Sequence, residues 1–554
     1  MSALTTPVSG GSTSINNPFD DPDAMTKSLP RRSSQEQGPI NPALILNVDR
    51  NASLTIAAES LVVLDEGLRH RRDTRNCFGL ISRWTKATQA IPFRNVLWAE
   101  VEDLTVTIKY ARPVGRGGKS CRVGCVQYSL VEKTTHAHAS QWVSTLMDRA
   151  YPARIKRRKR IKVLVNPFGG QGYAQSIWAK EVQPILAAAQ CDINVEATKY
   201  RGHAIEIAEA LDTSAFDVIA AASGDGLPHE IFNGLAKQKR PRAALTNLAV
   251  TQIPCGSGNA LSWNTLGTST PSWAAVEIVK GLSAPMDLMA VTQGKQRFYS
   301  FLSQAVGIIA ESDLGTESLR WMGPLRFQWG VLVRIFGKTI YPAEISVAIE
   351  TSDKERIRQM QKEGKVTERE AWRQRMNPQS LKDDEALLPP LRYGTVQDVM
   401  PEAFKTLDHP DLGNFYTGNM PTMTAGVTFF PEALLQDGFA DLIIVSGMIP
   451  RTTALRMLTA VENGSHVDFP EVEYSKVHAY RISPRMAPKA QVGQQGFRWK
   501  VTQWLGGAGR QTEGLIAIDG EKVPFEPFQV EVHQGLGTVL VRSDRLFAAG
   551  SSVA

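Results

Sequence analysis

Apolar residues recur with different periods along the chain, and each change of period marks an expected domain. Residues 1–43 are rich in Ser, Thr, Pro, Asn and Gly and are expected to form a disordered tail. Residues 44–153 alternate as short strands do, residues 155–288 alternate strand-length apolar runs with amphipathic helices, and residues 289–545 return to strand patterns. The pattern predicts a small β module, an α/β domain and a C-terminal β-sandwich.

The expected N-terminal module consists of several strands followed by one helix. The strand-like segments are Leu54–Ile56, Leu61–Leu64, Val96–Trp98, Leu104–Ile108 and Val126–Leu130. In the helical pattern that follows, Trp142, Leu146 and their neighbours share one apolar face. Strands closed by a C-terminal helix with a Trp resemble a pleckstrin-homology-like module, and a generic small β domain fits the same pattern.

Four apolar runs in the α/β domain have the length of buried parallel strands. They are Ile161–Val165, Cys191–Ala197, the run around Val218 and Ile219, and Thr251–Ile253. Helical patterns separate them, and in the first helix Trp178, Val182 and Leu186 form an apolar face. This alternation is typical of a parallel sheet covered by helices.

A Gly-Asp-Gly sequence follows the third of these strands. Gly224, Asp225 and Gly226 come just before Pro228, where a helix is expected to begin because Pro is tolerated at the first helical position. Asp225 would then lie at the carboxyl end of a buried strand, where open α/β sheets place their functional residues. An ordinary Gly-Asp-Gly turn is the alternative interpretation of this segment alone.

Glycine-rich loops also follow the first and fourth strands. They read Asn166-Pro167-Phe168-Gly169-Gly170-Gln171-Gly172 and Pro254-Cys255-Gly256-Ser257-Gly258-Asn259-Ala260. The free amides of such loops, with the positive end of the next helix, favour an anion. Neither loop is a Walker A sequence or a dinucleotide-binding G-x-G-x-x-G. Three glycine-rich loops at one edge of one sheet would supply the many N–H donors that a triphosphate needs.

Together these blocks resemble the signature blocks of fungal-type sphingosine (sphingoid long-chain base) kinases, within the diacylglycerol-kinase-like superfamily. Diacylglycerol kinases typically carry Gly-Gly-Asp-Gly-Thr and Gly-Thr-Gly-Asn-Asp at the same places. Here Ser223, Leu227, Ser257 and Ala260 differ from those sequences and favour the sphingoid-base branch. The resemblance covers about residues 161–350 and 418–540. One departure is Gln171, where relatives often carry Lys.

The resemblance implies roles for individual residues. Asp225 is the expected catalytic base, while Asp313 would bind the amine of the substrate and Ser303 would also contact the substrate. A structural salt bridge among Glu311, Asp313 and Arg320 is the alternative for Asp313. Without the resemblance, Asp519-Gly520 would be a simple hairpin turn. The residues expected to bind ATP are Asn166, Pro167, Phe168, Gly169, Gly170, Gly172, Thr198, Arg201, Ser223, Gly224, Gly226, Gly256, Ser257, Gly258, Asn259, Arg320, Arg326, Gly520 and Glu521.

Two segments look like insertions in the C-terminal β domain. Residues 352–411 are polar and helix-prone at first and then Pro-rich, and residues 485–511 are rich in Gly and Gln. Neither segment is expected to pack against the domain.

Composition limits the number of domains, the charge of the partners and the roles of the cysteines. The 554 residues, 42% of them hydrophobic, can form two or three cores, and the net charge of +7 favours anionic partners weakly. Five scattered cysteines do not form a disulfide framework. Cys121 and Cys125 with His136 and His138 match no usual zinc spacing, so no metal ligand is assigned.

Membrane association is expected to be peripheral, because no apolar run approaches a membrane span. Cys77 lies among arginines, a setting that suits S-palmitoylation, although a solvated loop with an unreactive thiol fits as well. The basic run Lys156–Arg160 is expected to be a solvated linker, with an acidic-lipid patch or a nuclear signal as alternatives.

The sequence as a whole predicts an ATP- and Mg²⁺-dependent kinase acting on the primary hydroxyl of sphingoid bases. A kinase of another lipid alcohol (diacylglycerol or ceramide) and a non-catalytic lipid- or nucleotide-binding protein are the alternatives. We expect a cytoplasmic and peripheral membrane protein that binds no nucleic acid. The sequence sets no oligomeric state.

Overall fold

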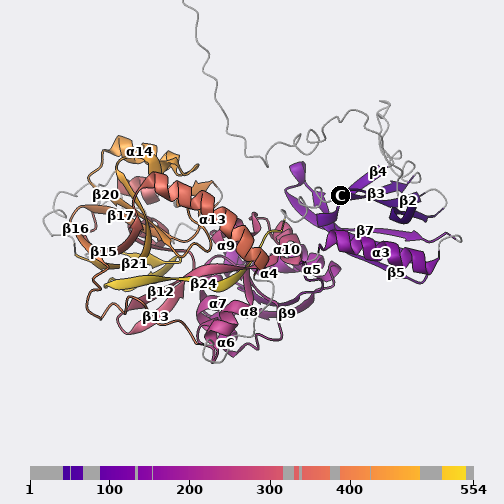
Figure 1. The fold of residues 1–554 in the computed structure, drawn as a ribbon, viewed down its shortest axis with the longest axis horizontal. Helices are drawn as coiled ribbons and strands as arrows, with labels where there is room; N and C mark the ends of the chain where they lie inside the picture. The colour runs from indigo at the N-terminus through magenta and orange to yellow at the C-terminus, as the bar shows by residue number, and fades with distance from the viewer. Residues whose placement is uncertain are drawn as a thin grey trace, which may run out of the picture. The chain divides into compact units, whose positions relative to one another are not determined.

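A computed structural model gives the structure of the protein, and it describes most of the chain. The described residues are 42–49, 52–65, 88–131, 135–152, 154–315, 330–335, 340–374, 387–424, 426–486 and 514–543. They divide into two compact units, residues 1–93 with 99–146 and residues 94–98 with 147–554 (Figure 1). The expected tail, most of the 485–511 insertion, Cys77, Arg320 and Arg326 lie outside the described residues.

The first unit consists of antiparallel strands and a helix, as the sequence predicts. One sheet has the order β1-β2-β3-β4 and the other the order β5-β6-β7. Their bounds are β1 Ile45–Val48, β2 Ala52–Ile56, β3 Ser60–Asp65, β4 Thr88–Pro92, β5 Val96–Glu102, β6 Thr105–Val114 and β7 Ser120–Ser129, with short 3₁₀ turns at Pro42–Leu44, Phe93–Asn95 and Arg116–Gly118. Helix α3 (His136–Ala150) buries Trp142 and Leu146, and the Trp142 indole donates a hydrogen bond to the Leu44 carbonyl at 3.0 Å. The sequence missed β1 and β4, which have only four and five residues.

The second unit opens with the predicted parallel sheet. Strands β8 (Arg160–Val165), β9 (Asp192–Ala197), β10 (Val218–Ser223) and β11 (Ala249–Pro254) pair in the order β11-β10-β8-β9. Val218 lies opposite Ile161 on one side and Ala249 on the other, so all three central strands end at the same edge. Every residue of β10 and β11 is buried, as expected for a parallel strand with both faces covered.

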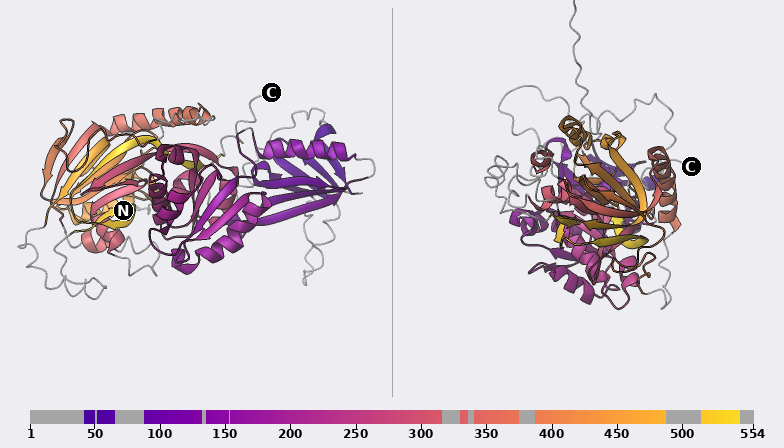
Figure 2. Two further views of the ribbon diagram at one scale, coloured as in Figure 1. Left: turned by 90° about the horizontal axis from the view of Figure 1, so that it is seen from below. Right: turned by 90° about the vertical axis from the view of Figure 1, so that its left-hand side faces the viewer.

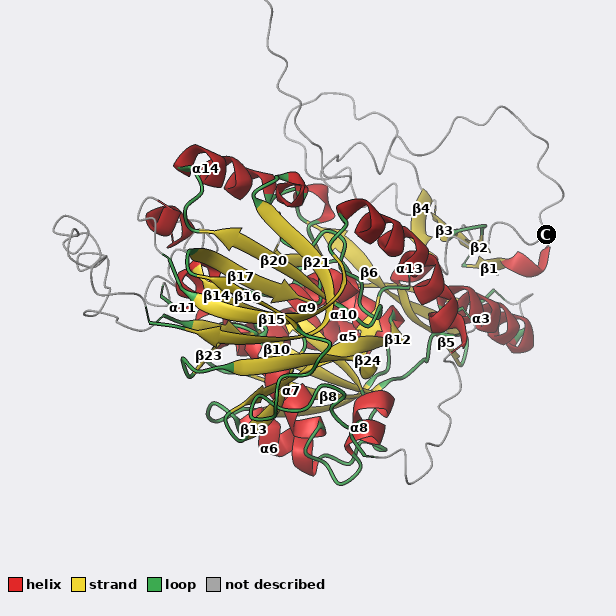
Figure 3. Ribbon diagram, turned by 60° about the vertical axis from the view of Figure 1, so that its left-hand side comes forward, coloured by secondary structure: helices red, strands yellow, loops and turns green. Residues whose placement is uncertain are grey.

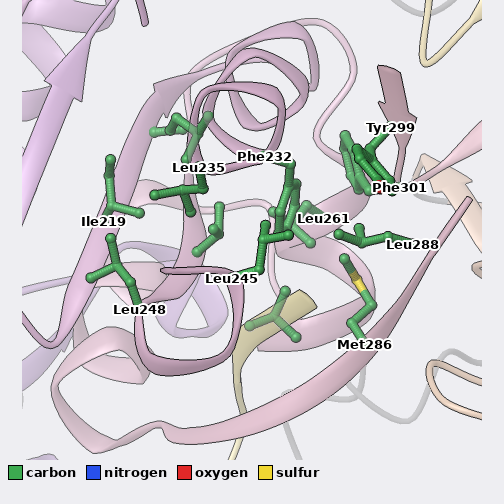
Figure 4. Packing of buried hydrophobic residues seen from close by; sticks show 14 of the residues in the cluster. Ile219, Phe232, Leu235, Leu245, Leu248, Leu261, Met286, Leu288, Tyr299 and Phe301 are labelled. Carbon is green, nitrogen blue, oxygen red and sulfur yellow. The ribbon is translucent and has the colours of Figure 1, made fainter. Parts of the chain in front are cut away.

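Helices cover both faces of this sheet. Their bounds are α4 Ala174–Ile177, η5 Trp178–Val182, α5 Gln183–Ala188, α6 His203–Ala210, α7 Gly226–Leu235, α8 Pro241–Asn247, α9 Ala260–Leu266 and α10 Pro271–Lys280, with a 3₁₀ turn, η4, at Gly169–Gly172. In Figures 1 and 3, α6, α7 and α8 group together on one side of the strands. Their core includes Ile219, Phe232 and Leu245 (Figure 4). Each such fully buried side chain contributes about 1.5–3 kcal/mol to folding.

The helix after the first glycine loop is a compound of three segments. Segment η5 is a π-helical stretch between the α-helical α4 and α5, and Pro184 lies in the first turn of α5. Pro has no N–H for the helical ladder, so the hydrogen-bond pattern widens before it. The predicted apolar face is retained, since Trp178, Val182 and Leu186 are all buried.

The parallel sheet continues directly into the C-terminal β domain through β24 (Phe528–Val541). Strand β24 pairs in parallel with β11 and antiparallel with β12 and β21. The remaining strands are β12 Leu282–Gln293, β13 Gln296–Ser300, β14 Ser303–Gly307, β15 Ala343–Thr351, β16 Lys405–His409, β17 Leu412–Gly418, β18 Thr422–Thr424, β19 Val427–Thr428, β20 Ala440–Ser446, β21 Val472–Pro484, β22 Ile516–Ile518 and β23 Glu521–Val523. Helices α11 (Ile308–Leu314), α13 (Lys354–Gln374) and α14 (Arg451–Ala460) and the 3₁₀ turn Ser465–Asp468 complete the unit. The domain boundary that the sequence predicted after residue 288 falls inside strand β12.

The expectation that residues 352–411 would not pack is wrong. The first part is α13, which runs along the outside of the C-terminal strands (Figure 2), with Ile357 fully buried. In the later part, Tyr393 and Phe404 are buried against each other, and β16 joins the sheet beside β15. The aromatic residues among the prolines and charges supply the apolar area that packs this segment.

The expectation that Lys156–Arg160 is a solvated linker is wrong in part: Lys156 and Arg158 are exposed, but Lys159 is buried and the run makes specific contacts. Asp217 accepts hydrogen bonds from Lys156 and Arg160, both at 2.8 Å. Lys159 is 4% exposed and donates to the Val279 carbonyl at 2.6 Å, and burial lowers its pKa to about 8. The run thus ties the start of β8 to Asp217 and to the Val279 carbonyl. The Asp217 carboxylate neutralises part of its positive charge.

Candidate active site

The three glycine-rich loops meet at the carboxyl edge of the parallel sheet, and we call residues 166–172, 223–226 and 256–259 the glycine edge. The first loop contacts the second, because the Asn166 amide donates to the Ser223 hydroxyl at 3.3 Å. Asn166 also accepts a hydrogen bond from the Phe168 N–H at 3.0 Å, which shapes its own loop. A Cβ on Gly169 would lie 3.1 Å from the Ser223 hydroxyl oxygen. Glycine is therefore what allows this approach.

The second and third loops touch through their backbones. A Cβ on Gly256 would collide with the Cα of Gly224, and one on Gly224 would lie 3.0 Å from the Gly258 carbonyl. Asn259 holds the third loop in shape by accepting from the Gly256 N–H at 3.0 Å and donating to the Gly256 carbonyl at 2.8 Å. Ser257 at the tip of that loop is exposed.

The loop after β9 supplies Thr198 and Arg201. Thr198 is buried and its N–H donates to the Val165 carbonyl at 2.9 Å, so it sets the position of the loop. Arg201 is 73% exposed and forms an ion pair with Glu521 from the far end of the chain. Glu230 accepts the N–H groups of Gly202 and Ala204 at 2.9 and 3.1 Å, which satisfies the first turn of α6.

Asp225 lies in the middle of the glycine edge as the N-cap residue of α7. The helix begins at Gly226, two residues before the predicted start at Pro228, so the prediction of its first turn was wrong. One carboxylate oxygen of Asp225 accepts the Ala260 N–H at 3.0 Å, and the other accepts the Leu261 N–H and the Gln252 amide, both at 3.2 Å. These donors, two of them from the first turn of α9, fix the orientation of the carboxylate.

The environment of Asp225 raises its pKa to about 6. Burial is the main cause, because it disfavours the charged form, and the negative charge of Asp519 adds to it. The hydrogen bonds from Ala260, Leu261 and Gln252 oppose the rise. A carboxylate with this pKa is ionised at neutral pH and is a better proton acceptor than an ordinary aspartate.

A second set of residues faces the glycine edge, and we call residues 300–303, helix α11 and the β22–β23 hairpin the hairpin side. Glu521 approaches the glycine edge, since a Cβ on Gly226 would lie 3.0 Å from its carboxylate. Asp313 on α11 lies beside the hairpin, 3.5 Å from where a Cβ on Gly520 would be. Ser303 begins β14, and its hydroxyl accepts a hydrogen bond from Tyr416 at 3.5 Å. The structure thus brings Asp225, Ser303, Asp313 and Glu521 into one region.

The alternative interpretation of Asp313 was a salt bridge among Glu311, Asp313 and Arg320, but Glu311 has a different partner. Glu311 pairs with Arg334 at 2.9 Å, whereas Arg320 and Arg326 lie outside the described residues. Phe168, predicted to bind ATP, is 78% exposed, as expected for a side chain at the rim of an open site.

Sequence reasoning missed His229, Asn233 and Asp519. The Asn233 amide links α7 to β13 by donating to and accepting from the backbone of Tyr299, in both cases at 2.8 Å. Asp519 is 2% exposed and is bonded to His229. His229 and Asn233 follow Asp225 by one and two helical turns, in the segment from Ser223 to Gly234 that resembles the family, but a sequence does not say what they contact.

The described residues contain no group of three or more His, Cys, Asp and Glu side chains placed to hold a metal ion. Cys121 is buried in β7 and Cys125 is exposed on the same strand. Among the described helices, none is both long and apolar enough to cross a membrane.

Comparison with protein families defines the class to which this fold and site belong. Residues 160–291 match the diacylglycerol kinase catalytic domain, and residues 414–496 match the YegS C-terminal NAD kinase beta sandwich-like domain. Residues 44–152 match a domain of unknown function, DUF7493. The match to the catalytic domain, together with relatives that are named kinases, indicates a lipid kinase.

Individual relatives identify the family more closely. Sphingoid long chain base kinase 4 of Schizosaccharomyces pombe is 32% identical over 81% of this chain and 87% of that protein. Sphingosine kinase 2 of Arabidopsis thaliana is 31% identical over 71% of this chain and 78% of that protein. Sphingoid long chain base kinase 5 of Saccharomyces cerevisiae is 34% identical over 73% of this chain, but the match spans only 62% of that protein. The chain belongs to the sphingoid long-chain base kinase family.

Proposed function

We propose that the protein transfers the γ-phosphate of ATP to the primary hydroxyl of a sphingoid long-chain base, such as sphingosine, dihydrosphingosine or phytosphingosine. The observation that carries this proposal is the position of Asp225. It lies among three glycine loops that can hold phosphates and opposite a side of the site that carries Asp313. The names of the relatives support the choice of acceptor.

Phosphoryl transfer depends mostly on positioning and on neutralising charge. The backbone N–H groups of the glycine edge would hold the phosphates, with the N-terminus of α7 adding its positive dipole end. Asp225 accepts three N–H hydrogen bonds and still has lone pairs for the acceptor hydroxyl. It would take the hydroxyl proton as the oxygen attacks phosphorus.

Mg²⁺ fits this site as the partner of ATP rather than as a metal held by a protein cage. The described residues offer no acidic cluster, and Mg²⁺ usually keeps several waters and binds through substrate phosphates with one or two carboxylates. Glu521, whose carboxylate lies near Gly226, would assist in holding the ion, and the ion would neutralise charge on the phosphates.

Asp313 would bind the ammonium group of the acceptor. A cation placed beside a lipid tail needs a paired anion, because an unpaired buried charge is costly. The C-terminal β domain, which carries Asp313, would receive the alkyl tail of the sphingoid base. Diacylglycerol and ceramide carry no ammonium group, so the role of Asp313 also separates this proposal from a kinase of those lipids.

We further propose that the protein is cytoplasmic and binds membranes peripherally. The strands and helix of the first unit support a pleckstrin-homology-like module, and Cys77 remains a candidate for lipidation. One acyl chain gives only marginal anchoring, so a second contact would be needed. Cys77→Ala should move the salt-resistant membrane fraction to the soluble pool, and unchanged fractionation would exclude a role for the thiol.

The test of the proposed activity is an assay of the purified protein with labelled ATP and a panel of lipid alcohols. Sphingoid bases should be phosphorylated at the primary hydroxyl, and diacylglycerol and ceramide at much lower rates. A preference for a neutral lipid would favour the other lipid kinase. Nucleotide binding without transfer to any acceptor would favour a non-catalytic protein.

A further inference from the structure

The side chain of Asp519 accepts far more hydrogen bonds than a hairpin turn requires. Asp519 and Gly520 have φ angles of 50° and 80°, the left-handed pair that a two-residue hairpin loop needs. Asn or Gly at the first position would satisfy that backbone equally well. The Asp519 carboxylate is nevertheless buried and accepts five hydrogen bonds, from the Ser300 hydroxyl (2.6 Å), the N–H groups of Phe301 (3.0 Å), Leu302 (3.0 Å) and Ser303 (2.9 Å), and His229 (2.7 Å).

Four of these hydrogen bonds fix one turn of the chain. They come from residues 300–303, the turn between β13 and β14, and the Asp519 N–H also donates to the Ser303 carbonyl at 2.8 Å. The hairpin and this turn therefore form one rigid body. The predicted acceptor-binding residue Ser303 is therefore held by the hairpin, and Asp313, the other one, lies beside the hairpin at Gly520.

The fifth hydrogen bond connects this body to the helix of the catalytic base. His229 is one turn after Asp225 on α7, and its N–H donates to the Asp225 carbonyl at 3.3 Å. Its ring Nδ1 lies 2.7 Å from the Asp519 carboxylate, and because an ionised carboxylate only accepts, Nδ1 must carry the proton. The two residues are 290 positions apart in the chain. Asn233, two turns after Asp225, makes the neighbouring contact to β13.

We propose that His229 and Asp519 are positioning residues that hold the acceptor-binding turn in register with Asp225. The inference rests on the proposed function and adds the reason why the hydroxyl of the acceptor meets the base. A shift of about 1 Å between the two sides would cost on the order of 10²-fold in rate. Neither residue needs to touch ATP or the acceptor to have this effect.

The charges around His229 are consistent with this role. Burial lowers the pKa of His229, but the hydrogen bond and charge of Asp519 raise it more, with Glu521 on the same hairpin and Glu230 on α7 adding to the rise. The His229 ring also packs edge-on against the Phe298 ring, with 6.3 Å between the ring centroids. A raised pKa means that His229 stays positively charged beside Asp519 to a higher pH than a free histidine, and that this charge is lost as the pH rises through the folded-state pKa.

The experiment compares His229→Leu with His229→Asn. Leu removes the donor, whereas the Asn amide can reach roughly the position of Nδ1 and still donate to Asp519. His229→Leu should lower kcat with a sphingoid base about 30-fold or more while the KM for ATP changes by less than about threefold. His229→Asn should recover most of that loss, but without the pH dependence that titration of the His229 ring gives the parent.

Asp287→Asn is the matched control. Asp287 is a fully buried carboxylate in β12 that accepts the Gly438 and Gly535 N–H groups, both at 2.6 Å. This variant should lower the melting temperature and leave kcat per folded molecule unchanged. Equal losses in His229→Leu and His229→Asn, or losses that follow the melting temperature in all three variants, would overturn the inference.

A measurement without catalysis separates this inference from the proposed function. NMR titration of the His229 ring should give a higher pKa in the parent than in Asp519→Asn, because the anionic partner is removed. An unchanged pKa would show that the pair does not form. If the parent prefers another lipid alcohol, the proposed function fails, and the same difference between His229→Leu and His229→Asn is expected with that acceptor.

Discussion

The two sides of the candidate site are built by different means. The glycine edge is made largely of backbone: Gly224 and Gly256 allow two loops to touch, and the Asn259 side chain bonds to Gly256 of its own loop. The hairpin side is made of side chains, with the buried Asp519 accepting donors from segments more than 200 residues away. The glycine edge is thus built from loops of one α/β domain, whereas the hairpin side depends on segments that are far apart in the chain.

Asp225→Asn removes the proposed base, on which both the glycine edge and the hairpin side depend, and should lower turnover more than any other substitution. Asn cannot take the hydroxyl proton, so turnover should fall by about 10²-fold or more, while ATP binding is nearly retained. Single-turnover kinetics and equilibrium nucleotide binding measure the two quantities. Turnover within a few-fold of the parent, in a variant that melts normally, would remove Asp225 from the role of base.

Asp313→Asn tests the hairpin side alone. Loss of a charged hydrogen bond of about 1.5–3 kcal/mol corresponds to roughly 10- to 150-fold in kcat/KM for a cationic sphingoid base. Use of a neutral lipid alcohol should change little. If both acceptors lose activity equally, Asp313 is structural and the amine is bound elsewhere.

Gly256→Ala tests the glycine edge alone. The added methyl would meet the Gly224 backbone, and overpacking of this kind costs about 1–3 kcal/mol. The KM for ATP should rise by about tenfold, with less effect on the KM for the acceptor. Gly294→Ala is the control. Gly294 has a φ of 55° and no neighbour within 4 Å, so its substitution strains the turn between β12 and β13 without a steric clash. A normal KM for ATP in Gly256→Ala would mean that the loop contact is not needed for nucleotide binding.

The pH dependence sharpens the assignment of the base. The pKa of Asp225 is raised to about 6, so its basic form is lost as the pH falls below that value. The kcat should fall by about tenfold for each unit of pH below 6. Because the folded-state pKa is above the unfolded one, ionisation of Asp225 lowers stability as the pH rises through 6, so activity and stability should change in opposite directions there. A flat rate profile between pH 5 and pH 7 would contradict the assignment.

Much of the α/β domain could be predicted because its signals are local. Runs of apolar residues gave β8 to β11, and glycine after each of three strands indicated the loops that the structure brings together. In a parallel sheet, carboxyl ends meet at one edge by geometry, so Asp225 and the third glycine loop were expected at the same edge, where the structure places Asp225 beside Gly258.

The wrong predictions came from short sequence patterns that are compatible with two different structures. Pro228 can occupy any position of the first helical turn, so it did not fix the start of α7. The basic run Lys156–Arg160 looked solvated because its partners Asp217 and Val279 are distant in sequence. Residues 387–411 looked irregular because the pattern did not reveal that Tyr393 and Phe404 pack against each other.

The sequence by itself predicted that the glycine loops and Asp225 would share one edge, since each strand and the loop after it are recognised from a few residues and the carboxyl ends of parallel strands meet at one edge. It also gave Asp519-Gly520 as a hairpin turn, which the φ angles match. Only the tertiary structure decided that the Asp519 carboxylate would be buried and bonded to His229. A carboxylate can be buried only where enough donors converge, and these donors come from residues 229 and 300–303, which are brought together by the fold of the whole second unit.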